Sequence, residues 1–203
     1  MGRRRCQTAR MSQSRAKVIR RLTMAQQDRR PVIVRRKHLD AYETSGVVIA
    51  VLDDWVVLHE LADGPYLDDV LLLRLDHVTK VRPYSDGEYL TRAVTGLAEP
   101  LAVFECASDA TVGDLLRMVD ARAEFVGVYG ETRKDYWLLI GKIHRIGRKR
   151  LDLHFIGRDG VWVDFVDALK LTEITRIEFG GRYIRALERF GDAAPDVERR
   201  LKR

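Results

Sequence analysis

Two histidines at matching places in related stretches of the chain are the residues best suited to chemistry. His59 follows Leu58, and His154 follows Leu153. An imidazole titrates near neutral pH, so each ring can carry a proton or bind a metal ion. Neither stretch has a second His or Cys at metal-ligand spacing, so we expect no metal and no cofactor. The alternative, which we favour, is a fold position in which each ring hydrogen-bonds nearby backbone or a carboxylate.

An aromatic residue followed two positions later by an aspartate also occurs in both stretches. Tyr66 precedes Asp68, and Trp162 precedes Asp164. One interpretation is a patch that stacks on a base or a peptide beside an acid. The other, which we favour, is structural: the aromatic rings fill the interior or the seam between the copies, and each aspartate accepts hydrogen bonds from turn amides.

Positive charge is kept in register between the two stretches. Arg74 corresponds to Lys170, and Lys80 corresponds to Arg176. On alternating strands these side chains would face solvent, where a shared basic stripe can contact phosphate. We expect them instead to pair with neighbouring acids, because this part of the chain carries net negative charge.

Arrangements typical of enzymes are absent from the sequence. It has no Gly-x-Ser-x-Gly, no Cys–His pair with an orienting acid and no glycine-rich phosphate loop. The neighbouring acids Asp53-Asp54 and Asp68-Asp69 would point to opposite faces of a strand, which makes them poor acid–base partners. We therefore expect no enzymatic activity; a site between the copies that uses both histidines is the remaining enzymatic interpretation.

These stretches are two copies of one module. Residues 46–81 align with 141–177 with one inserted residue, and ten positions are identical, where chance gives roughly two. The identities include Gly46 with Gly141 and the Asp-Gly turns Asp63-Gly64 and Asp159-Gly160. The fold can thus be argued twice from one pattern.

The elements that must position these residues are short strands. Apolar and β-branched runs predict strands at 31–36, two within 45–61, 66–75 and 77–83, and matching strands at 125–131, 135–147, two across Asp159-Gly160 and 174–179. Helices are predicted at 86–94, where Ser85 and Glu88 form a capping box, and at 181–191. A third helix carries Val112, Leu115, Leu116 and Val119 on one face, with Ser108 or Thr111 as its N-cap.

Charge is distributed unevenly along the 203 residues. Residues 1–37 hold thirteen Lys and Arg against one acid, a net +12, so the remainder of this +6 chain carries a net −6. The basic arm can bind nucleic acid or an anionic surface. It can also be a disordered tail or lie before the true start, since Met11 and Met24 are further possible starts.

Nothing in the sequence indicates a membrane span or a disulfide framework. No apolar run approaches the ~18 residues that a span needs, and no hydrophobic stretch follows Arg3 to Arg5. Two cysteines, Cys6 and Cys106, are typical of a reduced cytoplasmic protein.

The layout resembles the Sm-like small β-barrel, the fold of Hfq and the Sm proteins. The resemblance covers 31–83 and 112–179: a V-x-V strand, a glycine where the second strand bends, an Asp-Gly turn, and a closing V-T-K-V or I-T-R-I strand. It implies a mainly β protein with two tandem five-stranded barrels joined by a helix-containing linker. The family's RNA-contacting motifs are absent, since Leu75-Asp76 and Leu171-Thr172 stand near their place.

This organisation predicts five segments and a binding function. The segments are a disordered basic arm at 1–29, barrels at 30–95 and 124–191, a linker at 96–123 and a charged tail at 192–203. We expect a non-enzymatic interaction or scaffolding protein that pairs exposed strand edges with itself or with a protein partner. Binding of RNA or DNA through the arm and the barrel surfaces is the alternative.

Overall fold

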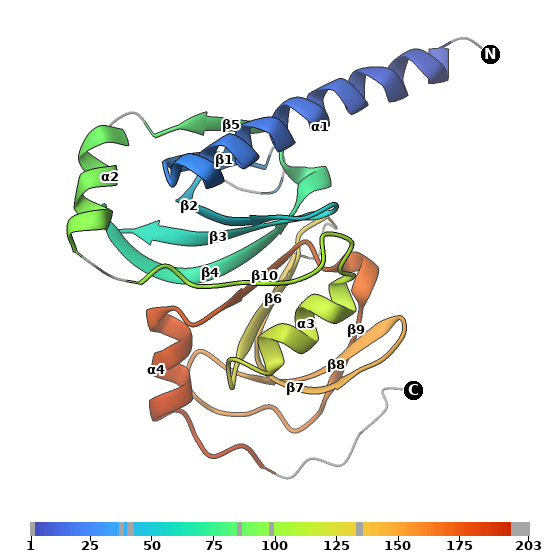
Figure 1. The fold of residues 1–203 in the computed structure, drawn as a ribbon. Coiled ribbons are helices and arrows are strands. Elements are labelled where there is room, and N and C mark those ends of the chain that lie inside the picture. Colours follow the sequence, from blue (N-terminus) through green and yellow to red (C-terminus); the bar gives the residue numbers. More distant parts are fainter. Residues whose placement is uncertain are drawn as a thin grey trace. The chain divides into compact units, whose positions relative to one another are not determined.

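The computed structural model describes residues 3–36, 39, 43–84, 87–97, 100–132 and 136–195. The chain forms two compact units, Met1–Asp68 with Leu72–Asp109, and Asp69–Leu71 with Ala110–Arg203. The boundary at Asp109 falls inside the predicted linker. The described residues are mainly β, as the sequence predicted, and they include four helices, one more than predicted (Figure 1).

The described residues of the first unit form five strands and two helices. The strands lie in the order β5-β1-β2-β3-β4, and β1 pairs antiparallel with both β2 and β5. Helix α1 packs on β2 and β5, and α2 packs on β1. The elements are α1 (Arg3–Asp28), β1 (Pro31–Arg35), β2 (Thr44–Val51), β3 (Trp55–Ala62), β4 (Tyr66–Arg74), the 3-10 turn η1 (Leu75–His77), β5 (Lys80–Pro83) and α2 (Gly87–Gly96).

The second unit repeats the same order of strands. Its strands follow the order β10-β6-β7-β8-β9, and α3 packs on β7. Asp69–Leu71, from the middle of β4, group with this unit, and the Asp69 carboxylate accepts a hydrogen bond from the N–H of Gly181 (2.9 Å), where α4 begins. The elements are α3 (Val112–Asp120), β6 (Val126–Gly130), β7 (Trp137–Ile146), β8 (Arg150–Ile156), β9 (Asp167–Lys170), η2 (Leu171–Glu173), β10 (Arg176–Phe179) and α4 (Arg182–Phe190).

The duplication extends to strand register. Val47 lies opposite His59 in the first unit, and Lys142 lies opposite His154 in the second, the pairing that the sequence alignment requires. Each second strand then has a bulge at the same step, between Val48 and Ala50 in β2 and at the corresponding residues of β7. A bulge bends a strand and increases its twist, so the two units share their curvature as well as their order.

A threonine before the last strand makes the same pair of hydrogen bonds in both units. Thr79 donates from its hydroxyl (3.2 Å) and its N–H (2.9 Å) to the carbonyl oxygen of Arg35. Thr175 donates through the same two groups, at the same distances, to Tyr129. These paired bonds hold the fifth strand against the first in each unit.

A glycine permits the closest approach of the second and third strands. A Cβ at Gly46 would lie 2.7 Å from the carbonyl oxygen of His59, and one at Gly141 would lie 2.0 Å from that of His154. Contacts this short with backbone cannot be relieved by a side-chain rotation. Both positions therefore require glycine, as the alignment of Gly46 with Gly141 suggested.

The predicted closed barrels are not observed. In neither unit does the hydrogen-bonded order of described strands return from the fourth strand to the fifth, so each sheet is open. The prediction assumed that five short strands can bury a sheet face only by curling up. Helices supply that cover instead: α1 and α2 lie on the first sheet, and α3 on the second.

Helix α1 forms where the sequence predicted a disordered basic arm. Val18, Leu22 and Ala25 are buried and follow one face of the helix. Arg15 lies against the acidic turns of the same unit, where it contacts Asp54 (2.9 Å) and Asp76. Basic charge in the arm thus complements the acidic unit on which α1 packs.

The remaining element predictions have mixed outcomes. The helices at 86–94, 112–120 and 181–191 are confirmed, and Thr111 is the N-cap of α3 in a capping box with Asp114. Ser85, of the other predicted box, lies outside the described residues. The strand expected after Gly160 is reduced to a single bridge between Ile156 and Trp162 followed by the short β9.

Burial of α1 predicts a large effect for Leu22→Ala. Leu22 is 0% exposed, so the change should lower the free energy of unfolding by about 2–5 kcal/mol. Met24→Ala on the same helix, at a side chain that is 56% exposed, should have almost no effect. Urea unfolding of both variants measures this; equal, small effects would mean that the helix is not docked.

Candidate functional site

Both duplicated histidines hydrogen-bond to backbone. The Nδ1 of His59 accepts from the N–H of Ala102 (3.1 Å), and the Nε2 of His154 lies 2.7 Å from the carbonyl oxygen of Val163. The residues are 9% and 6% exposed, respectively. Each ring ties its sheet to a chain segment that crosses it, which is a structural use of the imidazole.

The aromatic–acid pairs differ between the copies. Trp162 packs against the core cluster that contains Phe125, and its ring meets the ring of His154 at a centroid distance of 4.6 Å. Tyr66, in contrast, is 50% exposed. Asp68 is half-buried and Asp164 is exposed, so these residues do not form the same cluster twice.

Three of the four duplicated cations lie beside acids or on the surface. Lys170 forms an ion pair with Glu173 (3.1 Å), and Lys80 is exposed. Arg74 lies over the ring of Trp55 (5.0 Å to the centroid). Burial lowers the pKa of Arg74, and the nearby acids Asp54 and Asp76 oppose that shift.

Arg176, expected to face solvent, is part of a buried polar cluster. Its Nη2 donates to Oε2 of Glu178 (2.6 Å), and its guanidinium lies 4.5 Å from the ring centroid of Tyr129. The Tyr129 hydroxyl donates to Oε1 of the same carboxylate (2.8 Å). Gly127 makes room for Glu178, because a Cβ there would lie 2.6 Å from the Glu178 Cγ. The cluster is internally paired, which identifies it as a buried ion pair in the core of the second unit.

Tyr129 should remain protonated at a pH where ordinary tyrosines ionise. Burial, and then the Glu178 carboxylate, raise the pKa of this phenol. Its stabilising contribution is thus present below the usual tyrosine pKa of about 10 and is lost as the pH rises above it. Absorbance titration at alkaline pH should show one tyrosine that ionises only on unfolding, and Tyr129→Phe should remove that step. A titration in which all tyrosines ionise together in the folded protein would contradict the assignment.

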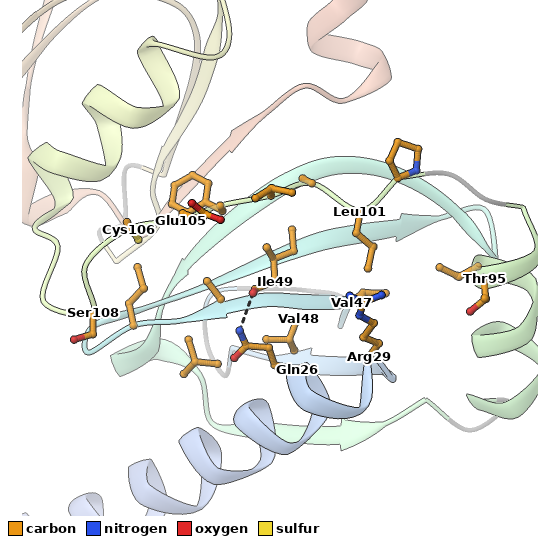
Figure 2. Close-up of a pocket in the computed structure, with 18 of the residues that line it drawn as sticks. Gln26, Arg29, Val47, Val48, Ile49, Thr95, Leu101, Glu105, Cys106 and Ser108 are labelled. Atoms are coloured by element: carbon orange, nitrogen blue, oxygen red, sulfur yellow. Dashed lines mark hydrogen bonds between the residues drawn. The ribbon is translucent and has the colours of Figure 1, made fainter.

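The first unit contains a groove with a volume of about 900 Å³, near the upper end of the range for ligand sites. Strand β2 forms its floor, and the segment 100–108, the end of α1 and the end of α2 form its walls (Figure 2). Most lining side chains are apolar. The residues that line it are Gln26, Arg29, Val47 to Leu52, Thr91, Val94, Thr95, Pro100 to Cys106, and Ser108.

The groove follows a stretch of β2 that has no neighbouring strand on one side. Strand β1 has five residues and β2 has eight, and their last pair is Pro31 with Val47. Along Val48–Val51, β3 is the only described strand that pairs with β2. Backbone groups of this stretch that point away from β3 therefore face the groove.

A glutamine side chain takes the place of the missing strand at one point. The Nε2 of Gln26, on the last turn of α1, donates to the carbonyl oxygen of Ile49 (2.9 Å). Figure 2 shows this bond at the floor of the groove. The N–H of Leu52 donates to the carbonyl oxygen of Trp55 (2.8 Å), so the preceding residue, Val51, presents its N–H and C=O on the side away from β3.

Arg29 enters the groove from a strained backbone position. Its φ is 51°, in the left-handed region that favours glycine. The turn ends α1: the N–H of Arg29 bonds to Gln26 (3.2 Å), and that of Arg30 bonds to Ala25 (3.1 Å). Glycine is the usual residue at this place in such a helix end. Arg29 occupies that place here, and its side chain lines the groove.

Arg29→Gly should therefore stabilise the protein. Removing the Cβ relieves the left-handed strain, which is worth about 1 kcal/mol in the free energy of unfolding. Arg30→Gly, one residue further along, should destabilise slightly because glycine loses more backbone freedom on folding. Thermal and urea unfolding of the two variants test this difference; destabilisation by Arg29→Gly would show that the backbone position is not strained.

Three further properties of the described residues concern metal binding, thiol chemistry and membrane spans. Among the described residues, no three His, Cys, Asp or Glu side chains gather as a metal site requires. Cys106 lines the groove as a half-buried thiol. No helix in the described parts of the chain is long and apolar enough to cross a membrane.

Sequence reasoning missed the groove residues and the Tyr129 cluster. Gln26 and Arg29 fell in the arm assigned to disorder, and the segment 100–108 fell in the linker. The signal that could have found the groove is the difference in length between the first two strands, since a longer second strand leaves part of its edge uncovered.

Comparisons with known proteins find no match: no protein-family model, no curated protein and no solved structure matches this chain.

Proposed function

We propose that this protein is a non-enzymatic interaction module that binds an extended polypeptide segment as an added strand beside Val48–Val51 of β2. The single observation that carries the proposal is the groove of about 900 Å³ beside the part of β2 that β1 leaves uncovered. An added strand satisfies backbone groups along its length, while pockets on either side select its alternate side chains. The Sm-like resemblance remains part of this proposal and is supported by the repeated strand order. A cytoplasmic location also remains part of it, on the ground of the two cysteines.

The walls of the groove suit an extended ligand better than a compact one. In Figure 2, Ile49 and Leu101 lie on the side of the segment 100–108, and Gln26 lies on the opposite side of β2. A bound strand would place its alternate residues toward these two walls. Val103, which is 70% exposed, adds apolar surface at the rim.

A bound strand can displace Gln26 from the edge of β2 without leaving the Ile49 carbonyl oxygen unpaired. The Gln26 side chain holds the Ile49 carbonyl oxygen while the groove is unfilled, so that no acceptor is left without a donor. A ligand N–H would replace that bond and add others to Val51. By covering the exposed edge of β2, Gln26 also hinders unwanted pairing with other chains, as side chains at the edges of natural sheets do.

Nucleic-acid binding through α1 is the second candidate, and the exposed cations Lys17 and Arg20 on that helix favour it. Two other arginines of α1 are engaged within the first unit: Arg15 with Asp54, and Arg21 with the carbonyl oxygen of Val81 (2.7 Å). The helix thus uses part of its positive charge for its own docking. This makes nucleic-acid binding the weaker of the two proposals.

The proposal predicts that selected peptides protect the edge of β2 from hydrogen exchange. The full chain is used to select binders from a library of displayed random peptides, and exchange is followed at the amides of Val48–Val51. Thr95→Trp and Ser108→Trp should each abolish binding, because both exposed residues line the groove and a large ring there fills it. Thr172→Trp, at an exposed threonine of the second unit, is the matched control and should leave binding intact.

The same measurement separates the competing functions. Selection that yields no peptide protecting Val48–Val51 would reject strand addition. A single-stranded RNA that binds in a salt-dependent way, while exchange at β2 is unchanged, would favour the second candidate. Light scattering adds a further outcome: if the chain occupies its own groove in a dimer, Thr95→Trp should yield a monomer.

A further inference from the structure

We propose that the ligand of the groove is the free C-terminal end of a polypeptide, bound antiparallel to β2 with its terminal carboxylate against Arg29. This inference rests on the strand addition proposed above and assigns a direction and an end to the added strand. Three observations carry it: the place where β1 begins, the charge at that end of the groove and the backbone conformation of Arg29.

The start of β1 limits how far an added strand can extend. β1 is antiparallel to β2, and its first pair joins Pro31 to Val47. A segment added antiparallel beside Val48–Val51 would run in the direction of β1 and arrive at Pro31. The backbone of β1 occupies the path beyond that point, so the bound segment must end or leave the sheet there. A chain terminus meets this condition without a turn.

Charge at this end of the groove selects between the two possible termini. Arg29 lies beside Val47, whereas Glu105 lies toward the opposite end, near Cys106 (Figure 2). A guanidinium attracts a carboxylate, forms charge-assisted hydrogen bonds with it, and repels an ammonium. The C-terminus of an antiparallel strand is thus favoured over the N-terminus of a parallel one.

The conformation of Arg29 supports a role for its side chain. Arg29 keeps a left-handed φ of 51° where glycine would be more stable. At the corresponding place before the first strand of the second copy the residue is Ala123, and its φ is not positive. Since the fold of the second unit manages without a cation there, the arginine is not a requirement of the repeated architecture.

The groove also specifies the chemistry of the tail. Its floor and walls are largely aliphatic, with Val48, Ile49 and Leu101 among the side chains that a ligand would meet. The tail should therefore carry apolar residues at alternate positions, including the last, since successive side chains of a strand point to opposite sides.

The test compares free and blocked C-termini. Random heptapeptides are displayed with a free C-terminal carboxylate, and the selected sequences are synthesised both as free acids and as C-terminal amides. Affinities for the full chain are measured by fluorescence anisotropy, and hydrogen exchange locates each peptide. Amidation should weaken binding roughly tenfold or more, the effect expected for loss of a charge-assisted hydrogen bond.

Variants at Arg29 identify the partner of the carboxylate. Arg29→Gln should weaken binding of the free acid roughly tenfold but leave the affinity of the amide unchanged, and Arg29→Lys should restore part of the loss. Arg30→Gln is the matched control, since Arg30 does not line the groove, and should have no effect. Circular dichroism and thermal unfolding confirm that each variant is folded.

The outcomes distinguish this inference from the proposal on which it rests. Peptides that protect Val48–Val51 but bind equally well as acid and amide would overturn carboxylate capture and leave strand addition standing. A preference for the free acid that survives Arg29→Gln would also overturn it. If no peptide protects Val48–Val51, strand addition itself fails, and this inference fails with it.

Discussion

Strand β2 needs hydrogen-bonding partners along both edges, and β1 supplies them along only part of its length. The difference between five residues and eight leaves the stretch after Val47 without a strand on one side. Several features of the first unit compensate for these missing hydrogen-bonding partners. Helix α1 ends where β1 begins, its last turn places Gln26 on the Ile49 carbonyl oxygen, and its buried face covers the sheet. The groove is what this partial cover leaves open.

The two copies share a skeleton and differ in what surrounds it. Register, bulge and the threonine bonds are the same in both units, because each depends on backbone geometry that a few residues determine. Side chains added around that skeleton have diverged. The first copy has a cationic helix end at Arg29, whereas the second has the buried pair of Arg176 and Glu178. Duplication thus preserved the sheet and left its edges and core polar groups free to change.

Patterns that report on the backbone predicted much of the fold. Apolar and β-branched runs predicted the strands, the alignment predicted that His59 and His154 are equivalent, and the helical spacing of Leu115, Leu116 and Val119 predicted α3. The errors came from long-range packing. Composition alone assigned α1 to disorder, because the benefit of burying Leu22 appears only when a sheet lies beneath it. Closed barrels were expected for the same reason: the cover supplied by helices was not counted.

The candidate site could not be predicted residue by residue. Arg176 belongs to a strand whose alternation places it toward solvent, but its guanidinium donates to Glu178 and lies against the ring of Tyr129, which leaves it half-buried. Gln26 and Arg29 have no motif of their own; their position relative to β2 follows from where α1 ends. Local sequence carries little information about such a position.

The glycines at the crossing of the second and third strands offer a way to recognise relatives of this chain. Gly46 and Gly141 cannot be replaced without displacing a facing carbonyl, and each precedes its Leu-His pair by the same eleven intervening residues. A search for this spacing, repeated about 95 positions later as in this sequence, tests ancestry without relying on overall similarity. A single-copy protein with the same spacing would represent the state before duplication, when the bulged strand already existed but the two halves had not yet specialised.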